Sequence, residues 1–164
     1  MSTSISSHTV PTIDLSEIRA FCSVSGTDDN ALLTMLYNAA CQEVVSYAHY
    51  IAGSATITVD QEWVSSYELP YWPIGAITSV TVYDKDDVAT VDTDYTFING
   101  ILSPSESGVR MVIVYSAGEA TLPADMKHAI YQRIKFGYDY GDDLPYDKPR
   151  FFDRIVTRYR RNFA

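Results

Sequence analysis

Few side chains in this sequence could do chemistry, and they do not fall into the pattern of a catalytic or metal site. The chain has three histidines, His8, His49 and His128, and two cysteines, Cys22 and Cys41. Their separations do not match the spacing of zinc ligands. His49 follows Cys41 by eight residues in one predicted helix, but no third group is evident that would orient such a pair. We therefore predict packing roles for these residues.

A cluster of carboxylates at Asp84, Asp86 and Asp87 superficially suggests a calcium loop. The segment lacks the glycine and the distal glutamate of a helical calcium loop, so a hairpin turn is the better interpretation. The sequence has no phosphate loop, nucleotide fingerprint or Gly-x-Ser-x-Gly motif. These observations predict a protein that is not an enzyme and that needs no cofactor and no metal.

Length and composition indicate one folded domain without a membrane span. The 164 residues are 46% hydrophobic and 20% charged, and no apolar run approaches the ~20 residues that a membrane helix needs. Residues 1–12 are rich in Ser and Thr and lack the features of a secretory signal, so we expect a flexible N-terminal arm. The two cysteines are expected as buried free thiols in a reducing cytoplasm, and a disulfide stays open as an alternative.

The charge is divided between an acidic body and a basic tail. Residues 1–147 carry 20 acidic and 6 basic side chains, a net charge of −14, whereas residues 148–164 carry 6 basic and 1 acidic side chain, a net charge of +5. An acidic body argues against capture of nucleic acid by the body. The basic tail favours contact with an acidic surface, either on a partner protein or on a neighbouring copy.

Three helices are predicted in the body, at residues 14–22, 28–52 and 122–139. The first begins with a capping pattern of Asp14 followed by Glu17, and the last begins after Pro123, which suits the first turn of a helix. Residues 55–115 change to the two-residue period of strands, with the strongest strand at Val109–Tyr115 and a hairpin signal at Asn99-Gly100.

The predicted fold class is α+β: a helical bundle with an inserted antiparallel sheet and a C-terminal amphipathic helix. The connector domain covers residues 13–143, and residues 144–164 form a linker and a tail whose helix begins at Pro149. A short helix such as this one is marginal alone and needs a surface to pack on.

Three blocks of this sequence resemble, in the same order, the head-tail connector proteins (adaptor or head completion proteins) of tailed bacteriophages. The blocks are Thr27–Leu33 with the following Ala39-Ala40 and Glu43–Val45, Leu69–Asp84, and Val114–Ile130 with its aromatic helix end. The resemblance covers roughly residues 13–143. The turn after the central strand usually carries a glycine in this family, where the present chain has Asp86-Asp87.

The resemblance implies a structural virion protein at the head-tail interface, in the neck, that assembles in the host cytoplasm. Copies would form a homo-oligomeric ring of about twelve beneath the portal protein, extend the DNA channel without sequence-specific binding, and offer a platform to downstream neck or tail proteins. The C-terminal segment would dock on the portal, with apolar residues filling a groove and arginines meeting an acidic rim. The expected portal-binding residues are Phe151, Phe152, Arg154, Ile155, Arg158, Tyr159, Arg160 and Arg161.

Two further sets of residues are candidates for roles in such a ring. Tyr67, Tyr71 and Trp72 flank prolines in a connection and are candidates for the subunit interface, with a core role as the alternative. An acidic wall would let DNA slide without sticking. The channel-lining candidates are Asp84, Asp86, Asp87, Asp142 and Asp143.

Three alternatives stay open at the level of the sequence. The C-terminal helix could fold back on its own body instead of docking on the portal. The chain could be a monomeric β-rich binding module that uses Tyr and Trp to stack on carbohydrate or adhesion ligands, although the long helices and the basic tail argue against this. The third alternative is an enzyme, which the lack of a catalytic pattern disfavours.

Overall fold

A computed structural model describes residues 2–140 and 150–160, and it confirms the α+β class. The chain divides into two compact units where the sequence predicted one domain. Of the described residues, 10–52, 120–140 and 150–160 form the helical unit, and 2–9 together with 53–119 form the strand unit. The channel-lining candidates at 142 and 143 and the portal-binding candidate at 161 lie outside the described residues.

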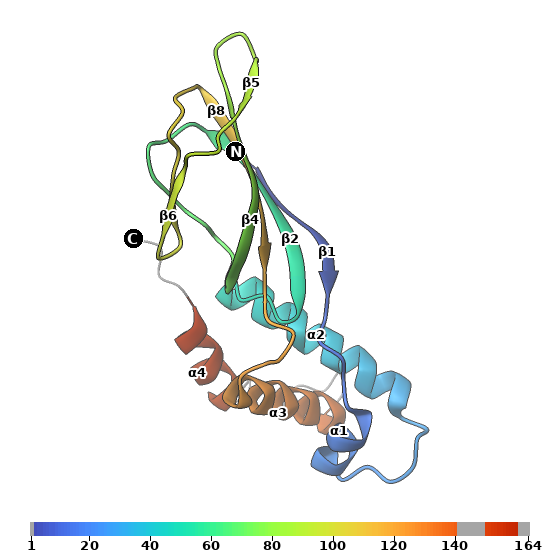
Figure 1. Ribbon diagram of the computed structural model, residues 1–164. Helices are drawn as coiled ribbons and strands as arrows, with labels where there is room; N and C mark the ends of the chain where they lie inside the picture. Colours follow the sequence, from blue (N-terminus) through green and yellow to red (C-terminus); the bar gives the residue numbers. More distant parts are fainter. Residues whose placement is uncertain (1, 141–149, 161–164) are drawn as a thin grey trace. The chain divides into compact units, whose positions relative to one another are not determined.

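The helical unit contains α1 (Leu15–Cys22), α2 (Asn30–Ala48), α3 (Ala124–Tyr140) and α4 (Arg150–Tyr159) (Figure 1). The predicted start of α1 is confirmed, because the Asp14 carboxylate accepts hydrogen bonds from the backbone N–H groups of Ser16 (2.9 Å) and Glu17 (3.3 Å). In α3 the apolar residues Met126, Ala129, Ile130 and Ile134 recur at helical spacing and are all at 0% exposure, whereas Phe136 further along the helix is half-buried.

Helix α2 ends at Ala48, four residues before the predicted end. His49 adopts the left-handed conformation (φ 54°), and its backbone N–H donates to the carbonyl oxygen of Val45 at 3.0 Å. The apolar period nevertheless continues beyond this residue, because Tyr50, Ile51 and Ala52 are all fully buried. A periodic pattern therefore indicated burial correctly here, but not helical conformation.

The strand unit is built on a five-stranded antiparallel sheet in the order β1-β2-β8-β4-β5 (Figure 1). Its strands are β1 (Ser2–Thr9), β2 (Ser54–Glu62), β8 (Arg110–Ala117), β4 (Ile74–Tyr83) and β5 (Ala89–Val91). The strand predicted to be strongest, β8, is the central one, and its alternate residues Met111, Ile113 and Tyr115 are fully buried. Val109, the first residue of the predicted strand, lies just before β8 and is 54% exposed, so the burial begins only at Met111.

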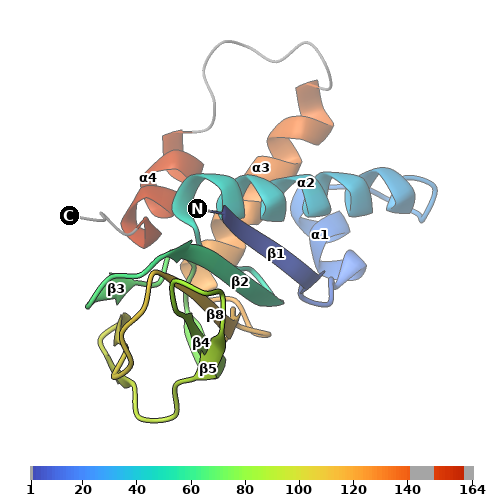
Figure 2. The ribbon, with the colours of Figure 1, turned by 90° about the horizontal axis from the view of Figure 1, so that it is seen from above.

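The N-terminal segment is a strand, and the prediction of a flexible arm at residues 1–12 is wrong for residues 2–9. Strand β1 pairs with β2 in antiparallel register, with Ile5 opposite Ile57, and it forms one edge of the sheet (Figure 2). Most of its side chains are exposed and polar. The segment therefore lacks the alternation of apolar residues from which strands are recognised in a sequence.

A second, three-stranded sheet has the order β3-β7-β6, formed by β3 (Tyr67–Glu68), β7 (Ile101–Ser103) and β6 (Thr96–Ile98). The predicted hairpin turn at Asn99-Gly100 is confirmed, since both residues have positive φ (54° and 86°) and join the paired strands β6 and β7. In residues 2–140 and 150–160, no helix has the length and apolar character needed to cross a membrane.

Candidate interaction surfaces

Helix α4 packs on its own helical unit, against α2 and α3. Phe152, Ile155 and Val156 are 2%, 3% and 0% exposed, so the apolar side of the helix belongs to the core. In this conformation the helix therefore folds back on its own unit, as the alternative from the sequence had it, and a portal-binding role for Phe152 and Ile155 stays a prediction. The amphipathic pattern correctly predicted that α4 packs on a surface, but it could not tell whether that surface belongs to this chain or to the portal.

Polar and aromatic contacts hold α4 in this position. The Tyr159 hydroxyl donates to Oδ1 of Asp125 at 2.6 Å, and its ring meets the ring of Tyr50 edge-on at a centroid distance of 5.3 Å. Near the other end of the helix, the ring of Phe151 meets that of His128 edge-on at 5.1 Å. Predicted portal-binding residues at both ends of α4 therefore also serve the packing of the helical unit.

The arginines of α4 remain on the solvent side. Arg154, Arg158 and Arg160 are exposed. The guanidinium carbon of Arg154 lies 6.0 Å from the centroid of the Phe151 ring, and that of Arg160 lies 5.4 Å from the centroid of the Tyr47 ring. These contacts leave the cationic groups accessible, so this side of α4 can meet an acidic surface without being detached from the helical unit.

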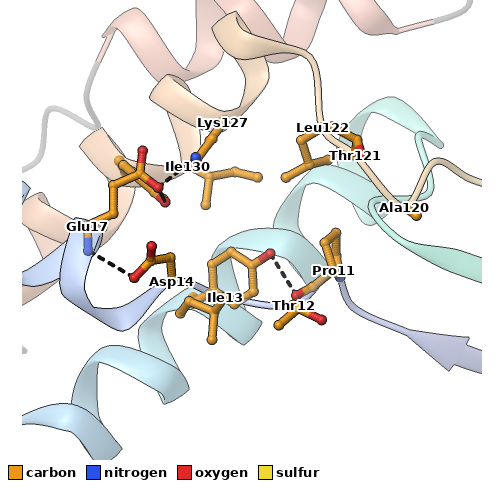
Figure 3. A pocket seen from close by; sticks show the side chains of 12 residues that line it. Pro11, Thr12, Ile13, Asp14, Glu17, Ala120, Thr121, Leu122, Lys127 and Ile130 are labelled. Atoms are coloured by element: carbon orange, nitrogen blue, oxygen red, sulfur yellow. Dashed lines mark hydrogen bonds and ion pairs between the residues drawn. The ribbon is translucent and has the colours of Figure 1, made fainter.

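A pocket of about 230 Å³ lies in the helical unit, between the start of α1 and the first turns of α3 (Figure 3). Three of its polar side chains are bound to each other: Nζ of Lys127 donates to Oε2 of Glu17 at 2.6 Å, and the Tyr131 hydroxyl donates to the same oxygen at 3.1 Å. The hydrogen bond from Lys127 lowers the pKa of the Glu17 carboxyl, and the same bond raises the pKa of Lys127. A carboxylate held ionised in this way is a poor general acid.

Sequence reasoning assigned Glu17 only to the start of a helix and did not find this network. Lys127 and Tyr131 lie more than a hundred residues along the chain from Glu17. No local pattern could have revealed their contact. In the described parts of the chain, no group of three or more His, Cys, Asp or Glu side chains is placed to hold a metal ion.

The channel-lining candidates of the described chain lie in the turn between β4 and β5. Asp84, Asp86 and Asp87 are all exposed. The Asp84 carboxylate accepts from the backbone N–H groups of Asp86 (2.8 Å) and Val88 (2.9 Å), and Asp87 pairs with Arg110 at 3.1 Å. Asp87 has φ 59°, the left-handed conformation that glycine adopts most easily. The hairpin turn is therefore confirmed, while the charges still face solvent.

The subunit-interface candidates Tyr67, Tyr71 and Trp72 are each half-buried within the strand unit. Tyr67 lies opposite Leu102 in the three-stranded sheet, and burial raises the pKa of its hydroxyl. The hydroxyl of Tyr115 accepts from the backbone N–H of Tyr71 at 3.0 Å. These residues do not form an exposed aromatic platform, and an interface role for them stays a prediction.

This chain is similar to one protein family and to several solved structures. The family described as head completion protein matches residues 12–140. No curated protein sequence matches the chain. Three solved structures share its fold over 100% of this chain and 97% of theirs. The first is a chain in the neck of the empty gene transfer agent (GTA) particle computed with C6 symmetry, with 17% identity and a TM-score of 0.80. The others are a chain in the virion of the native GTA particle (18% identity, TM-score 0.79) and a chain in the neck of the native particle computed with C12 symmetry (18% identity, TM-score 0.77).

Proposed function

Because the chain belongs to the head completion protein family, we propose that it is a structural component of the neck of a tailed phage-like particle, where a ring of copies sits on the portal and continues the DNA channel. The family match over residues 12–140 is the observation that carries this proposal. The shared fold with chains from gene transfer agent necks, which were computed with six- and twelvefold symmetry, supports cyclic assembly and a ring of about twelve copies.

The portal contact is assigned to the arginine side of α4. Arg154, Arg158 and Arg160 present cations on a helix whose apolar side is buried in the core of the helical unit. Preorganised cations steer association with an acidic rim and set its specificity. In this arrangement Phe152 and Ile155 position the helix, and the arginines make the contact.

The channel wall is assigned to the acidic turn of the strand unit. Residues 53–119 carry ten acidic and two basic side chains. The carboxylates of Asp84, Asp86 and Asp87 are among those that are exposed. A wall of negative charge repels the phosphate backbone, so that DNA passes without being held. A reconstruction of the assembled neck that placed all three aspartates on the outer rim would remove this part of the proposal.

Charge reversal on α4 tests the portal contact without disturbing the core. We expect the double variant Arg154→Glu, Arg158→Glu to bind portal rings at least about tenfold more weakly than the original chain in co-sedimentation at low salt. Its melting temperature should stay unchanged, since both side chains are exposed. The matched control is Lys85→Glu, which reverses a cation that is 80% exposed in the β4–β5 turn. Equal binding of the double variant and the control would overturn the assignment.

The alternative of a monomeric binding module finds no supporting observation among the described residues, because Tyr67, Tyr71 and Trp72 are half-buried. Light scattering of the chain mixed with portal rings separates the two functions. A neck component gives a complex that contains several copies per portal ring, whereas a binding module leaves both species at their separate masses.

A further inference from the structure

We propose that one side of α2 is the surface on which a neighbouring copy of this chain packs in the ring. This surface, called here the α2 stripe, consists of Leu32, Met35, Ala39, Gln42 and Ser46. The inference rests on the proposed ring and goes further by naming the surface through which copies meet.

The α2 stripe is an uncharged surface, apolar at three of its five positions, that the helical unit leaves uncovered. Leu32 is 39% exposed and Met35 is 59% exposed, and the other three stripe residues are exposed as well. The five positions are separated by three, four, three and four residues, so they lie along one side of the helix. The buried residues Leu33 and Val44 occupy other positions of the helical turn. The stripe extends about 20 Å, which matches the length of a helix-to-helix contact.

The stripe is also free of charge, in a chain where charges are otherwise frequent. Of the nineteen residues of α2 only Glu43 is charged, and it is bound by Nε of Arg133 at 2.8 Å. A helix with apolar residues on every side is normally buried on every side. Cores of protein interfaces are likewise depleted in charge and enriched in side chains such as Met.

The distribution of charge favours a second copy as the occupant. Each copy carries a net charge of −9, so copies that approach one another must avoid burying carboxylates without partners. The α2 stripe allows close approach because none of its five residues has to lose the hydration of a charge. DNA would need cations that the stripe lacks, and the exposed arginines that suit an acidic portal rim are on α4.

A photo-reactive residue placed within the stripe tests this inference directly. Met35 is replaced by the cross-linker p-benzoyl-phenylalanine in the full chain, which is mixed with portal rings of the same particle and irradiated. We expect chain-to-chain cross-links that form a ladder of oligomers. The variant Met35→Glu should give at least about tenfold fewer copies bound per portal ring, because each contact would then bury an unpaired carboxylate. The matched control is Val88→Glu, at a residue that is 58% exposed in the strand unit.

The outcomes separate this inference from the function on which it rests. If the original chain does not assemble on the portal, the proposed function fails, and the inference falls with it. If a ring forms but residue 35 cross-links to portal protein or to nothing, only the inference is overturned. It is also overturned if Met35→Glu assembles normally, or if Val88→Glu disrupts the ring equally. A loss confined to Met35→Glu, with an unchanged melting temperature, supports the α2 stripe as the contact between copies.

Discussion

The carboxylate of Asp92 is held by Ser105 through two hydrogen bonds, one from the backbone N–H at 2.7 Å and one from the hydroxyl at 2.6 Å. Asp92 is only 2% exposed, and its carboxylate also accepts from the backbone N–H groups of Asp94 (3.0 Å) and Glu106 (3.2 Å). A single buried anion thus joins two loops of the strand unit that are thirteen residues apart in the chain.

Replacing this anion should destabilise the protein. We expect Asp92→Asn to lower the free energy of unfolding by about 2 kcal/mol, because the amide offers one acceptor oxygen and turns an N–H group toward donors. Urea denaturation followed by fluorescence or circular dichroism measures the change. The control Asp94→Asn alters an exposed carboxylate nearby and should unfold like the original chain. If the two variants have equal stability, the buried anion does not stabilise the strand unit.

Low pH should also remove the stability that the ionised Asp92 carboxylate contributes. Burial raises the pKa of Asp92, but the hydrogen bonds from Ser105, Glu106 and Asp94 outweigh burial and place the pKa below its ordinary value. A carboxyl whose pKa is lower in the folded state stabilises the fold above its unfolded pKa, which is about 3.9, and loses that effect as pH falls through the folded pKa. The melting temperature of the original chain should be nearly constant from about pH 7 to pH 5 and fall below about pH 4. The difference in melting temperature between the original chain and Asp92→Asn should become smaller as pH falls below about 4. A difference that stays constant there would contradict this role of Asp92.

Both thiols should be unreactive in the folded protein. Burial raises the pKa of Cys41 to about 12 and also raises that of Cys22, and both are free and buried. Since the thiolate is the reactive form, little reaction with a disulfide reagent is expected at about pH 8 before unfolding. In denaturant both cysteines should react rapidly. Titration with a chromogenic disulfide reagent measures this, and fast reaction of either thiol in the native protein would show that its site opens.

Removing a buried side chain of α4 should lower the free energy of unfolding far more than removing one of its exposed charges. Phe152→Ala deletes a side chain that is 2% exposed, and we expect a loss of about 3–5 kcal/mol in the free energy of unfolding. Arg154→Ala, at an exposed position two residues later, should change stability by less than about 0.5 kcal/mol. Thermal unfolding of both variants provides the comparison. Equal stability would show that α4 does not pack on the helical unit as described.

Local signals in the sequence predicted much of this fold. The Asp14 cap, the buried face of β8 and the Asn99-Gly100 turn each depend on a few neighbouring residues, and all three are present in the structure. The predicted family is also confirmed by the match over residues 12–140, and with it the prediction of a structural, non-enzymatic protein.

Features that depend on distant residues escaped prediction. Strand β1 is recognisable only through its pairing with β2, about fifty residues later, because its own side chains are almost all polar. The pairing of Glu17 with Lys127 likewise needs a partner far along the chain. For α4 the sequence offered the fold-back only as an alternative, because the surface that it packs on comes from distant helices. The buried role of Asp92 has the same cause, since Ser105 lies in another loop.

The edge formed by β1 has a consequence for a protein that must gather in many copies at one place. Its side chains are mostly serine and threonine hydroxyls, and its pairing is interrupted between Ser6 and Thr9, where Ser7 has φ 54°. An irregular, hydrated border is a poor template for adding further strands. This edge of the sheet is thus shielded against uncontrolled fibrous growth, even where crowding would favour it.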